Sequence, residues 1–227
     1  HELGRATAHT LDTLRSIEKE NAAGTLPETV PASFATLSEQ LRTIVKRVET
    51  LDPLSTSRRQ QREDFDLFHL VRQVVDSRSA QAARHKIIWD GNFRDDRRWI
   101  INGVKGMLIQ IVENLISNSI YWLDVNRDIY PSLLLTITID LARDEEQLVY
   151  VDNGTGVDPA HSERIFEPFV SHRPAKDGKG LGLYISREIA GYHDWTLTML
   201  KESTVRPGRY NTFVLDLSHG RKPKGSK

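Results

Sequence analysis

The hydrophobic pattern of the first quarter of the chain predicts two helices joined by a loop. In residues 34–51 apolar side chains recur at spacings of three and four, which is typical of an amphipathic helix with a heptad seam. Residues 1–20 show a similar helical bias, and Gly24, Pro27 and Pro31 interrupt the pattern between the two segments. The apolar positions are Leu3, Leu11, Leu14, Ile17, Phe34, Leu37, Leu41, Ile44, Val48 and Leu51.

A single pair of antiparallel helices cannot bury both of its apolar stripes. We therefore predict that residues 1–57 form a helical hairpin that pairs with a second copy of the chain as a dimeric four-helix bundle. The alternative is that the hairpin packs on the globular part of its own chain. Residues 58–64 are polar and charged, and we predict that they form a linker.

Beyond the linker the pattern changes to short alternating segments mixed with longer helical ones. Strands are predicted at 65–67, 87–89, 99–101, 133–141, 147–151, 195–200 and 212–217, and helices at 69–83, 103–123, 160–165 and 182–192. This mixture predicts an α+β fold over residues 65–219, with a helical layer on one face of a mixed sheet. Residues 220–227 are basic and contain Gly and Pro, and we predict a disordered tail.

Composition and charge exclude several classes of protein. Thirty-one Lys and Arg residues balance 31 Asp and Glu residues, which argues against binding to nucleic acid. The absence of cysteine excludes disulfides, thiolate catalysis and cysteine-based zinc sites. No segment approaches 18 consecutive apolar residues, so we expect no membrane contact from this chain. The chain begins with His1 rather than Met, which indicates a fragment of a longer protein.

Two amides lie within the apolar helix predicted at 103–123. Asn114 and Asn118 are four residues apart and therefore share one helix face. Buried amides are costly unless something polar meets them, and an amide oxygen is a suitable ligand for Mg²⁺. The alternative is that both amides serve helix packing.

A carboxylate, Asp152, stands at the end of a predicted strand and precedes Gly154 and Gly156. The glycines allow a flat ligand to approach the backbone closely, and an ionised carboxylate accepts hydrogen bonds from donors such as a nucleobase amino group. An ordinary glycine-rich turn is the alternative interpretation.

A second glycine-rich segment, residues 178–183, directly precedes the helix predicted at 182–192. Its backbone N–H groups and the positive end of the helix dipole favour an anion, although neither a Rossmann motif nor a P-loop is present. The preceding loop, residues 158–177, contains Phe166, Phe169, Arg173 and Lys176, and could cover a triphosphate. The cations could equally be solvated surface charges.

Taken in order, these segments resemble the ATP-binding domain of two-component sensor histidine kinases, within the GHKL ATPase superfamily. Residues 114–119 resemble its N box, 152–156 its G1 box, 166–169 its F box and 178–183 its G2 box, and 209–213 lie where that family has its last strand. His1-Glu2-Leu3 resembles the start of the H box, 113 residues before Asn114. The resemblance implies a Bergerat-type α/β sandwich after the helical hairpin.

The resemblance implies binding of ATP with Mg²⁺, transfer of the γ-phosphoryl group to His1, and onward transfer to an aspartate of a response-regulator receiver domain. Glu2 would steady the His1 ring, Asn118 would bind the metal, and Asn114 replaces the glutamate that activates water in hydrolysing relatives. The chain would act as a cytoplasmic homodimer, in a parent protein that can be membrane-anchored. The implied nucleotide-binding residues are Asn114, Asn118, Trp122, Asp152, Gly154, Gly156, Phe166, Phe169, Arg173, Lys179, Gly180, Leu181, Gly182 and Thr212.

The chain departs from the family pattern at two places. Arg5 stands where the family positions water for phosphatase activity, so we expect no phosphatase activity. Tyr121 stands where the family often has a basic residue, and Trp122 follows it, either lining the nucleotide pocket or belonging to the core. Two alternatives remain open: a GHKL nucleotide-binding switch that never phosphorylates itself, and a structural dimerisation module that binds no nucleotide.

Overall fold

The computed structural model describes residues 61–129, 132–174, 180–203 and 205–218. The chain divides into two units, His1–Thr56 and Ser57–Lys227, and the described residues belong to the second. The predicted hairpin at 1–57, its dimerisation and the predicted tail at 220–227 therefore lie outside the described residues.

The second unit is built on a mixed five-stranded sheet with the strand order β2-β4-β5-β7-β6. β2 runs parallel to β4, whereas β4 with β5, β5 with β7, and β7 with β6 pair antiparallel. A small separate sheet pairs β1 (Glu63–Asp66) with β3 (Ile100–Gly103), so folded structure already begins at Glu63, within the predicted linker. The strands of the large sheet are β2 (Ile87–Asp90), β4 (Leu135–Ala142), β5 (Gln147–Asp152), β6 (Thr196–Met199) and β7 (Thr212–Asp216).

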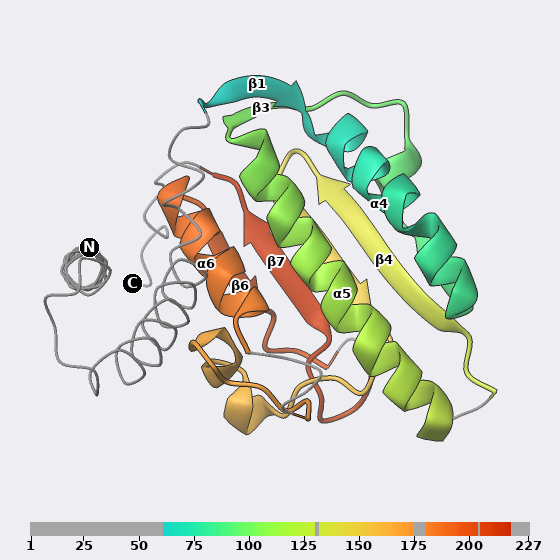
Figure 1. Cartoon of the computed structure of the whole chain (residues 1–227). Coiled ribbons are helices and arrows are strands. Elements are labelled where there is room, and N and C mark those ends of the chain that lie inside the picture. Colours follow the sequence, from blue (N-terminus) through green and yellow to red (C-terminus); the bar gives the residue numbers. More distant parts are fainter. Residues whose placement is uncertain (1–60, 130–131, 175–179, 204, 219–227) are drawn as a thin grey trace, which may run out of the picture. The chain divides into compact units, whose positions relative to one another are not determined.

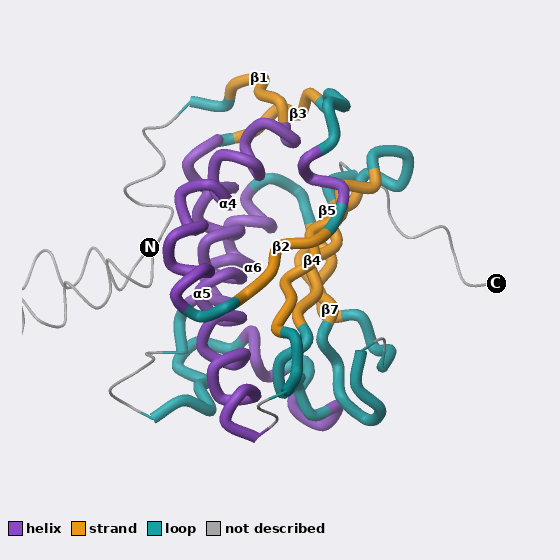
Figure 2. The backbone as a smooth tube through the Cα atoms, turned by 90° about the vertical axis from the view of Figure 1, so that its right-hand side faces the viewer, coloured by secondary structure: helices purple, strands orange, loops and turns teal. Residues whose placement is uncertain are grey.

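Three helices cover one face of this sheet: α4 (Leu67–Arg84), α5 (Lys105–Ile129) and α6 (Gly182–Tyr192) (Figure 1). The side view in Figure 2 shows the helices and the strands as two separate layers. The alternation in β4 produces this arrangement, because Leu135, Ile137, Ile139 and Leu141 are buried while the residues between them are partly exposed. The predicted helical layer over a mixed sheet is confirmed.

Several element ends differ from the predictions. Leu67, predicted as strand, begins α4, because the Asp66 carboxylate caps the helix by accepting a hydrogen bond from Phe68 N at 3.2 Å. α5 continues to Ile129, six residues beyond the predicted end at Leu123, and buries Asn126 completely. The helix predicted at 160–165 consists of two 3₁₀ turns, Pro159–His161 and Arg164–Phe166. A further 3₁₀ turn spans Asn92–Arg94.

None of the helices in the described part is both long and apolar enough to cross a membrane.

Candidate functional site

The Asp152 carboxylate lies at the end of β5 and is fixed through both of its oxygens. Oδ2 accepts a hydrogen bond from Ser119 Oγ at 2.6 Å, and Oδ1 accepts one from the backbone N–H of Gly154 at 2.9 Å. Burial raises the pKa of this carboxyl above its ordinary value, and hydrogen bonds from Ser119, Gly154 and Asn211 partly offset the rise. The two hydrogen bonds thus fix the orientation of the Asp152 carboxylate, and burial removes part of its hydration.

Two hydroxyl groups that the sequence analysis missed support this carboxylate. The buried Tyr150 hydroxyl donates to Ser119 Oγ at 2.9 Å, and Ser119 in turn donates to Asp152. Burial and the charge of Asp152 raise the pKa of the Tyr150 phenol well above its ordinary value, so it stays protonated and donates. The spacing of Tyr150 and Asp152 on one strand was the available signal, since residues two apart share a sheet face.

The turn after β5 brings backbone and ring surfaces close to Asp152. A Cβ atom added at Gly154 would lie 2.8 Å from Asp152 Oδ1 and 3.4 Å from Trp122 Cβ, so Trp122 of α5 borders the turn. Gly156 has φ +67°, and a Cβ there would lie 2.6 Å from Asn211 Oδ1. Only glycine fits both positions without displacing these neighbours.

Strand β7 and the residue before it close the other side of this turn. Thr212 pairs with Val151 of β5 and is buried. Asn211 donates from Nδ2 to Gly154 O at 3.4 Å, while its buried Oδ1 has no hydrogen-bond partner among the described residues. An acceptor with unused capacity therefore lies beside Asp152, where a ligand with amino donors would satisfy both groups.

Asn118 of α5 meets the loop at 158–174, which we call the lid, through Arg173. The guanidinium Nη2 donates to Asn118 Oδ1 at 2.5 Å and to the Ser117 carbonyl at 3.4 Å. The guanidinium carbon also lies 4.3 Å from the centre of the Tyr121 ring, a cation–π contact. The side-chain oxygen of Asn118, which is predicted to bind a metal, therefore already accepts a hydrogen bond from a positively charged group.

Asn114 joins α5 to the start of α6. Its Nδ2 donates to the Gly182 carbonyl at 3.0 Å and to Ser186 Oγ at 3.1 Å. These contacts join α5 to α6, and they bring the first amide of the N box beside the last glycine of the G2 box. The neighbouring Glu113 turns to α4, where its carboxylate accepts from Arg78 Nη2 at 2.8 Å.

The F box divides between the core and the surface. Phe166 is buried and packs edge-to-face on Phe213 of β7, with a ring separation of 6.3 Å. Phe169 is 61% exposed, has φ +65°, and donates its backbone N–H to the Gly180 carbonyl at 2.9 Å. A Cβ at Gly180 would lie 2.6 Å from the Phe169 carbonyl carbon, so a glycine is needed where the F box meets the buried Leu181 at the start of α6.

The predicted site residues thus fall into five contacting groups, three of which include a residue of α5. The structure brings together Asn114 with Gly182, Asn118 with Arg173, Asp152 with Gly154 and Trp122, Gly156 with the segment before Thr212, and Phe169 with Gly180. Ser119 lies next to Asn118 in α5 and donates a hydrogen bond to Asp152. Phe166 stands apart as a core residue, and His1, Glu2 and Lys179 lie outside the described residues.

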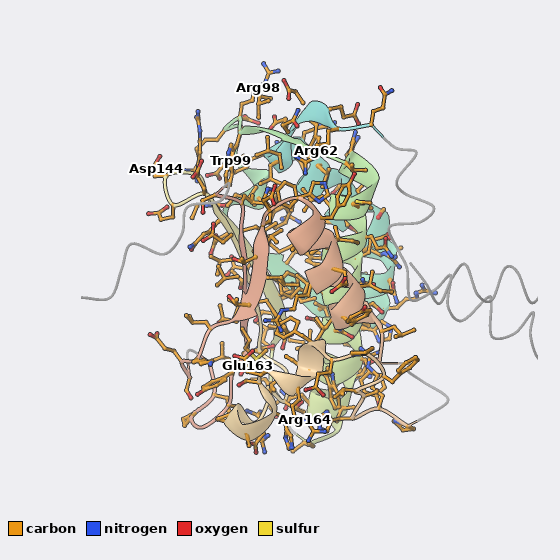
Figure 3. All side chains as sticks on the ribbon, turned by 90° about the vertical axis from the view of Figure 1, so that its left-hand side faces the viewer. Arg62, Arg98, Trp99, Asp144, Glu163 and Arg164 are labelled. Atoms are coloured by element: carbon orange, nitrogen blue, oxygen red, sulfur yellow. The ribbon has the colours of Figure 1, made fainter. Side chains whose placement is uncertain are left out.

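A cavity of about 330 Å³ lies at the opposite end of the sheet, beside the turn between β4 and β5. Figure 3 shows the two ends, with Arg98 and Asp144 at the cavity end and Glu163 and Arg164 at the lid end. The cavity is lined by Phe68, Asn92, Arg97, Arg98, Leu141, Ala142, Arg143, Asp144 and Glu145.

Within the described ranges, no three His, Asp or Glu side chains cluster as a metal site, so Mg²⁺ at the predicted site would depend on amide and phosphate oxygens.

Comparison with known proteins adds a family match. Residues 103–221, more than half of the chain, match the family described as histidine kinase-, DNA gyrase B- and HSP90-like ATPases. The chain is 33% identical over 173 residues to sensor protein ChvG of Rhizobium meliloti (strain 1021), covering 70% of this chain and 28% of ChvG. It is 30% identical over 112 residues to sensor protein SrrB of Staphylococcus aureus (strain NCTC 8325 / PS 47), covering 48% and 18%. The chain therefore spans less than a third of either relative.

Solved structures share the fold. A mycobacterial sensor histidine kinase, MprB, superimposes with a TM-score of 0.53 at 20% identity and covers 67% of this chain and 94% of its own. The Acinetobacter baumannii histidine kinase AdeS gives 0.53 at 19% identity over 95% of each chain. Full-length ShkA, solved in complex with AMPPNP, gives 0.55 at 20% identity and covers 94% of this chain and 44% of that one.

Proposed function

The chain belongs to the histidine kinase-, DNA gyrase B- and HSP90-like ATPase family, and from this membership we propose that it is the catalytic core of a sensor histidine kinase. Its second unit binds ATP, and the γ-phosphoryl group passes to His1. The observation that carries the proposal is the half-buried Asp152 carboxylate, held by Ser119 and Gly154 beside the unpartnered oxygen of Asn211.

The adenine amino group suits this pair of acceptors. An ionised carboxylate can only accept hydrogen bonds, so Asp152 selects a ring that presents an N–H donor. The close backbone at Gly154 and Gly156 leaves room for a flat ring, with Trp122 bordering the same turn. Adenine specificity then follows from donor direction and shape.

The phosphate end of the nucleotide would meet groups from α5 and the lid. Asn118 Oδ1 already accepts from the guanidinium of Arg173, so this oxygen is suited to a cation and would be the protein ligand of Mg²⁺. Bound Mg²⁺ would neutralise charge on the phosphates. Arg173 adds positive charge on the same side.

Phosphoryl transfer needs positioning more than covalent chemistry from the protein. A ring nitrogen of neutral His1 forms the new N–P bond to the γ-phosphorus as the bond to the bridging oxygen breaks. The electron pair of that bond leaves with ADP, and the phosphorylated ring carries a positive charge until its other nitrogen releases its proton to solvent. Glu2 would accept a hydrogen bond from the other ring nitrogen and steady the positive charge.

The direction of Glu113 supports transfer to a protein over hydrolysis of ATP. A hydrolase of this family needs a carboxylate beside the nucleotide to activate water, and Glu113 instead pairs with Arg78 of α4. Asn114, which faces α6, carries an amide that cannot act as a base. A GHKL switch without autophosphorylation is therefore the less favoured function.

The remaining roles follow from the same proposal. The phosphoryl group would pass from His1 to an aspartate of a response-regulator receiver domain. The hairpin at 1–57 would form a homodimer, and the described unit would work in the cytoplasm, within a parent protein that can be membrane-anchored. Arg5, where the family positions water, argues against phosphatase activity.

Incubation with γ-labelled ATP tests the proposal. We expect acid-labile, alkali-stable label on the wild-type chain, no label on His1→Gln, and wild-type labelling of the matched control His9→Gln. Label that persists in His1→Gln would place the acceptor elsewhere. ATP binding without any label, in a chain extended upstream of His1, would favour the nucleotide-binding switch, and absence of ATP binding would favour the structural module.

A further inference from the structure

A half-buried cluster of Arg173, Asn118 and Tyr121 joins the lid to α5. Arg173 and Tyr121 are 52 residues apart in sequence, so the tertiary structure alone brings a cation to position 121, where the helix itself has none. Tyr121 lies three residues after Asn118 and shares its helix face, which lets one guanidinium bond the amide and cover the ring at once.

We propose that Tyr121 positions Arg173 so that its guanidinium occupies Asn118 Oδ1 before nucleotide binds and then transfers to the phosphates. The proposal rests on the proposed function and deepens it: Arg173 is the phosphate-binding cation, and Tyr121 is a positioning residue that acts through it.

Competition for a single oxygen drives the exchange. Mg²⁺ and a guanidinium cannot both bind Asn118 Oδ1 closely, because two cations at such short range repel each other. A guanidinium binds phosphate with charge-assisted, often bidentate hydrogen bonds that are stronger than a bond to a neutral amide. Phosphate oxygens therefore draw Arg173 away from Asn118 as the metal arrives with them.

The Tyr121 ring keeps this exchange local. The cation–π contact at 4.3 Å does not use the N–H groups of the guanidinium in the ring plane, so Arg173 can change hydrogen-bond partners without leaving the ring. A purely structural role for Arg173 would differ, since it would affect every ligand of the pocket alike.

Calorimetric titration of the full chain with ATP, ADP and adenosine, each with and without Mg²⁺, distinguishes the two roles. We expect Arg173→Gln to weaken Mg-ATP binding by about tenfold, as for loss of a hydrogen bond to a charged group, and adenosine binding by less than about twofold. Arg164→Gln, which removes another cation of the lid that is exposed and pairs with Glu167, is the matched control and should change neither affinity.

Variants at position 121 test the positioning role. Tyr121→Phe keeps the ring face and should bind Mg-ATP like the wild type, whereas Tyr121→Leu should weaken it several-fold without affecting adenosine. In the double variant Tyr121→Lys with Arg173→Gln, the helix itself provides the cation, and most of the lost Mg-ATP affinity should return.

Equal weakening of adenosine and Mg-ATP in Arg173→Gln would overturn the proposal, as would identical behaviour of Tyr121→Phe and Tyr121→Leu. Both results leave the proposed function intact if the wild type binds ATP and Asp152→Asn weakens that binding. A wild-type chain that binds no ATP would overturn the proposed function and this inference together.

Discussion

At the scale of single residues, the candidate site is held in place at the expense of stability. The Asp152 carboxylate loses hydration in the fold, which is why its pKa is raised despite hydrogen bonds from Ser119, Gly154 and Asn211. The negative charge that would bind the ligand therefore lowers the stability of the folded chain.

This conflict gives Asp152→Asn opposite effects on stability and on binding. A raised pKa means that the stabilising contribution of Asp152 is complete below the unfolded-state pKa, where both states are protonated, and is lost as pH rises through the folded-state pKa. Asparagine does not ionise, so Asp152→Asn should be more stable than the wild type at neutral pH, with no difference in acid. Thermal unfolding at a series of pH values measures this, and a less stable variant at neutral pH would contradict it.

The same substitution should weaken ATP binding by about 10- to 100-fold, because a hydrogen bond to a charged acceptor is lost. In the wild type, protonation of Asp152 should have a similar effect. ATP affinity should therefore fall as pH decreases through the raised pKa of Asp152, at a higher pH than an ordinary aspartate would require. Isothermal titration across the acid range checks this, and a flat profile would remove Asp152 from the binding site.

At the scale of elements, the last turns of α5 anchor the turn that carries Asp152. Asn126 is completely buried, donates from Nδ2 to the Asn153 carbonyl at 2.9 Å and accepts from Arg206 at 2.9 Å. Asn153 in turn accepts from Thr136 N at 2.8 Å with its side chain and so binds the turn to β4. Helix α5 thereby connects the turn at 152–156 to the sheet and to the segment before β7.

Removal of this anchor should destabilise the unit. Asn126→Ala would leave the Asn153 carbonyl and the Arg206 guanidinium without these bonds, and we expect a loss of about 1–3 kcal/mol in the free energy of unfolding. Asn102→Ala is the matched control, since Asn102 is exposed and its bond to Asp64 is also exposed, and it should change stability by less than about 0.5 kcal/mol. Similar values for the two variants in chemical denaturation would refute the anchoring role.

A second link fixes the opposite end of α5. His193, after α6, accepts from Val104 N at 2.9 Å through Nε2, while its Nδ1 lies 2.8 Å from the Ile189 carbonyl. The two contacts require a neutral ring with the proton on Nδ1. The ring also stacks on Trp195 with centroids 4.3 Å apart, so α5 and α6 are joined by a buried polar contact as well as by apolar packing.

At the scale of the whole molecule, the described unit keeps its candidate site and its cavity at opposite ends. The Asp152 turn and the lid lie at one end of β4 and β5, and the arginine-lined cavity lies at the other. Because the candidate site depends on amide and phosphate oxygens rather than on a carboxylate cluster, metal and nucleotide should bind together.

Removal of magnesium tests this dependence. In the presence of a chelator we expect phosphoryl transfer to stop and ATP affinity to fall, whereas adenosine affinity should stay within about twofold, because its contacts lie at Asp152. Asn118→Ala should abolish the difference between ATP affinity with and without Mg²⁺. Calorimetry measures both, and an equal ATP affinity in the wild type with and without Mg²⁺ would contradict a metal role for Asn118.

The sequence by itself determined the elements of the second unit and the order of its motifs. Periodicity is local, so the alternation in 133–141 and the helical spacing in 182–192 predicted β4 and α6 without knowledge of their neighbours. The four boxes and their order predicted membership of the GHKL superfamily, and the family match of residues 103–221 agrees with that prediction. The hairpin at 1–57 and the acceptor role of His1 stay predictions.

Only the tertiary structure decided which polar groups meet. The path from Tyr150 through Ser119 to Asp152 joins β5 to α5, and Arg173 crosses from the lid to Tyr121. The end of α5 was missed for the same reason, since Asn126 looks like a solvated residue until Asn153 and Arg206 are placed around it. A local pattern records which face of an element is apolar, but the partner of a polar side chain depends on residues tens of positions away, and only the folded chain brings them within hydrogen-bond distance.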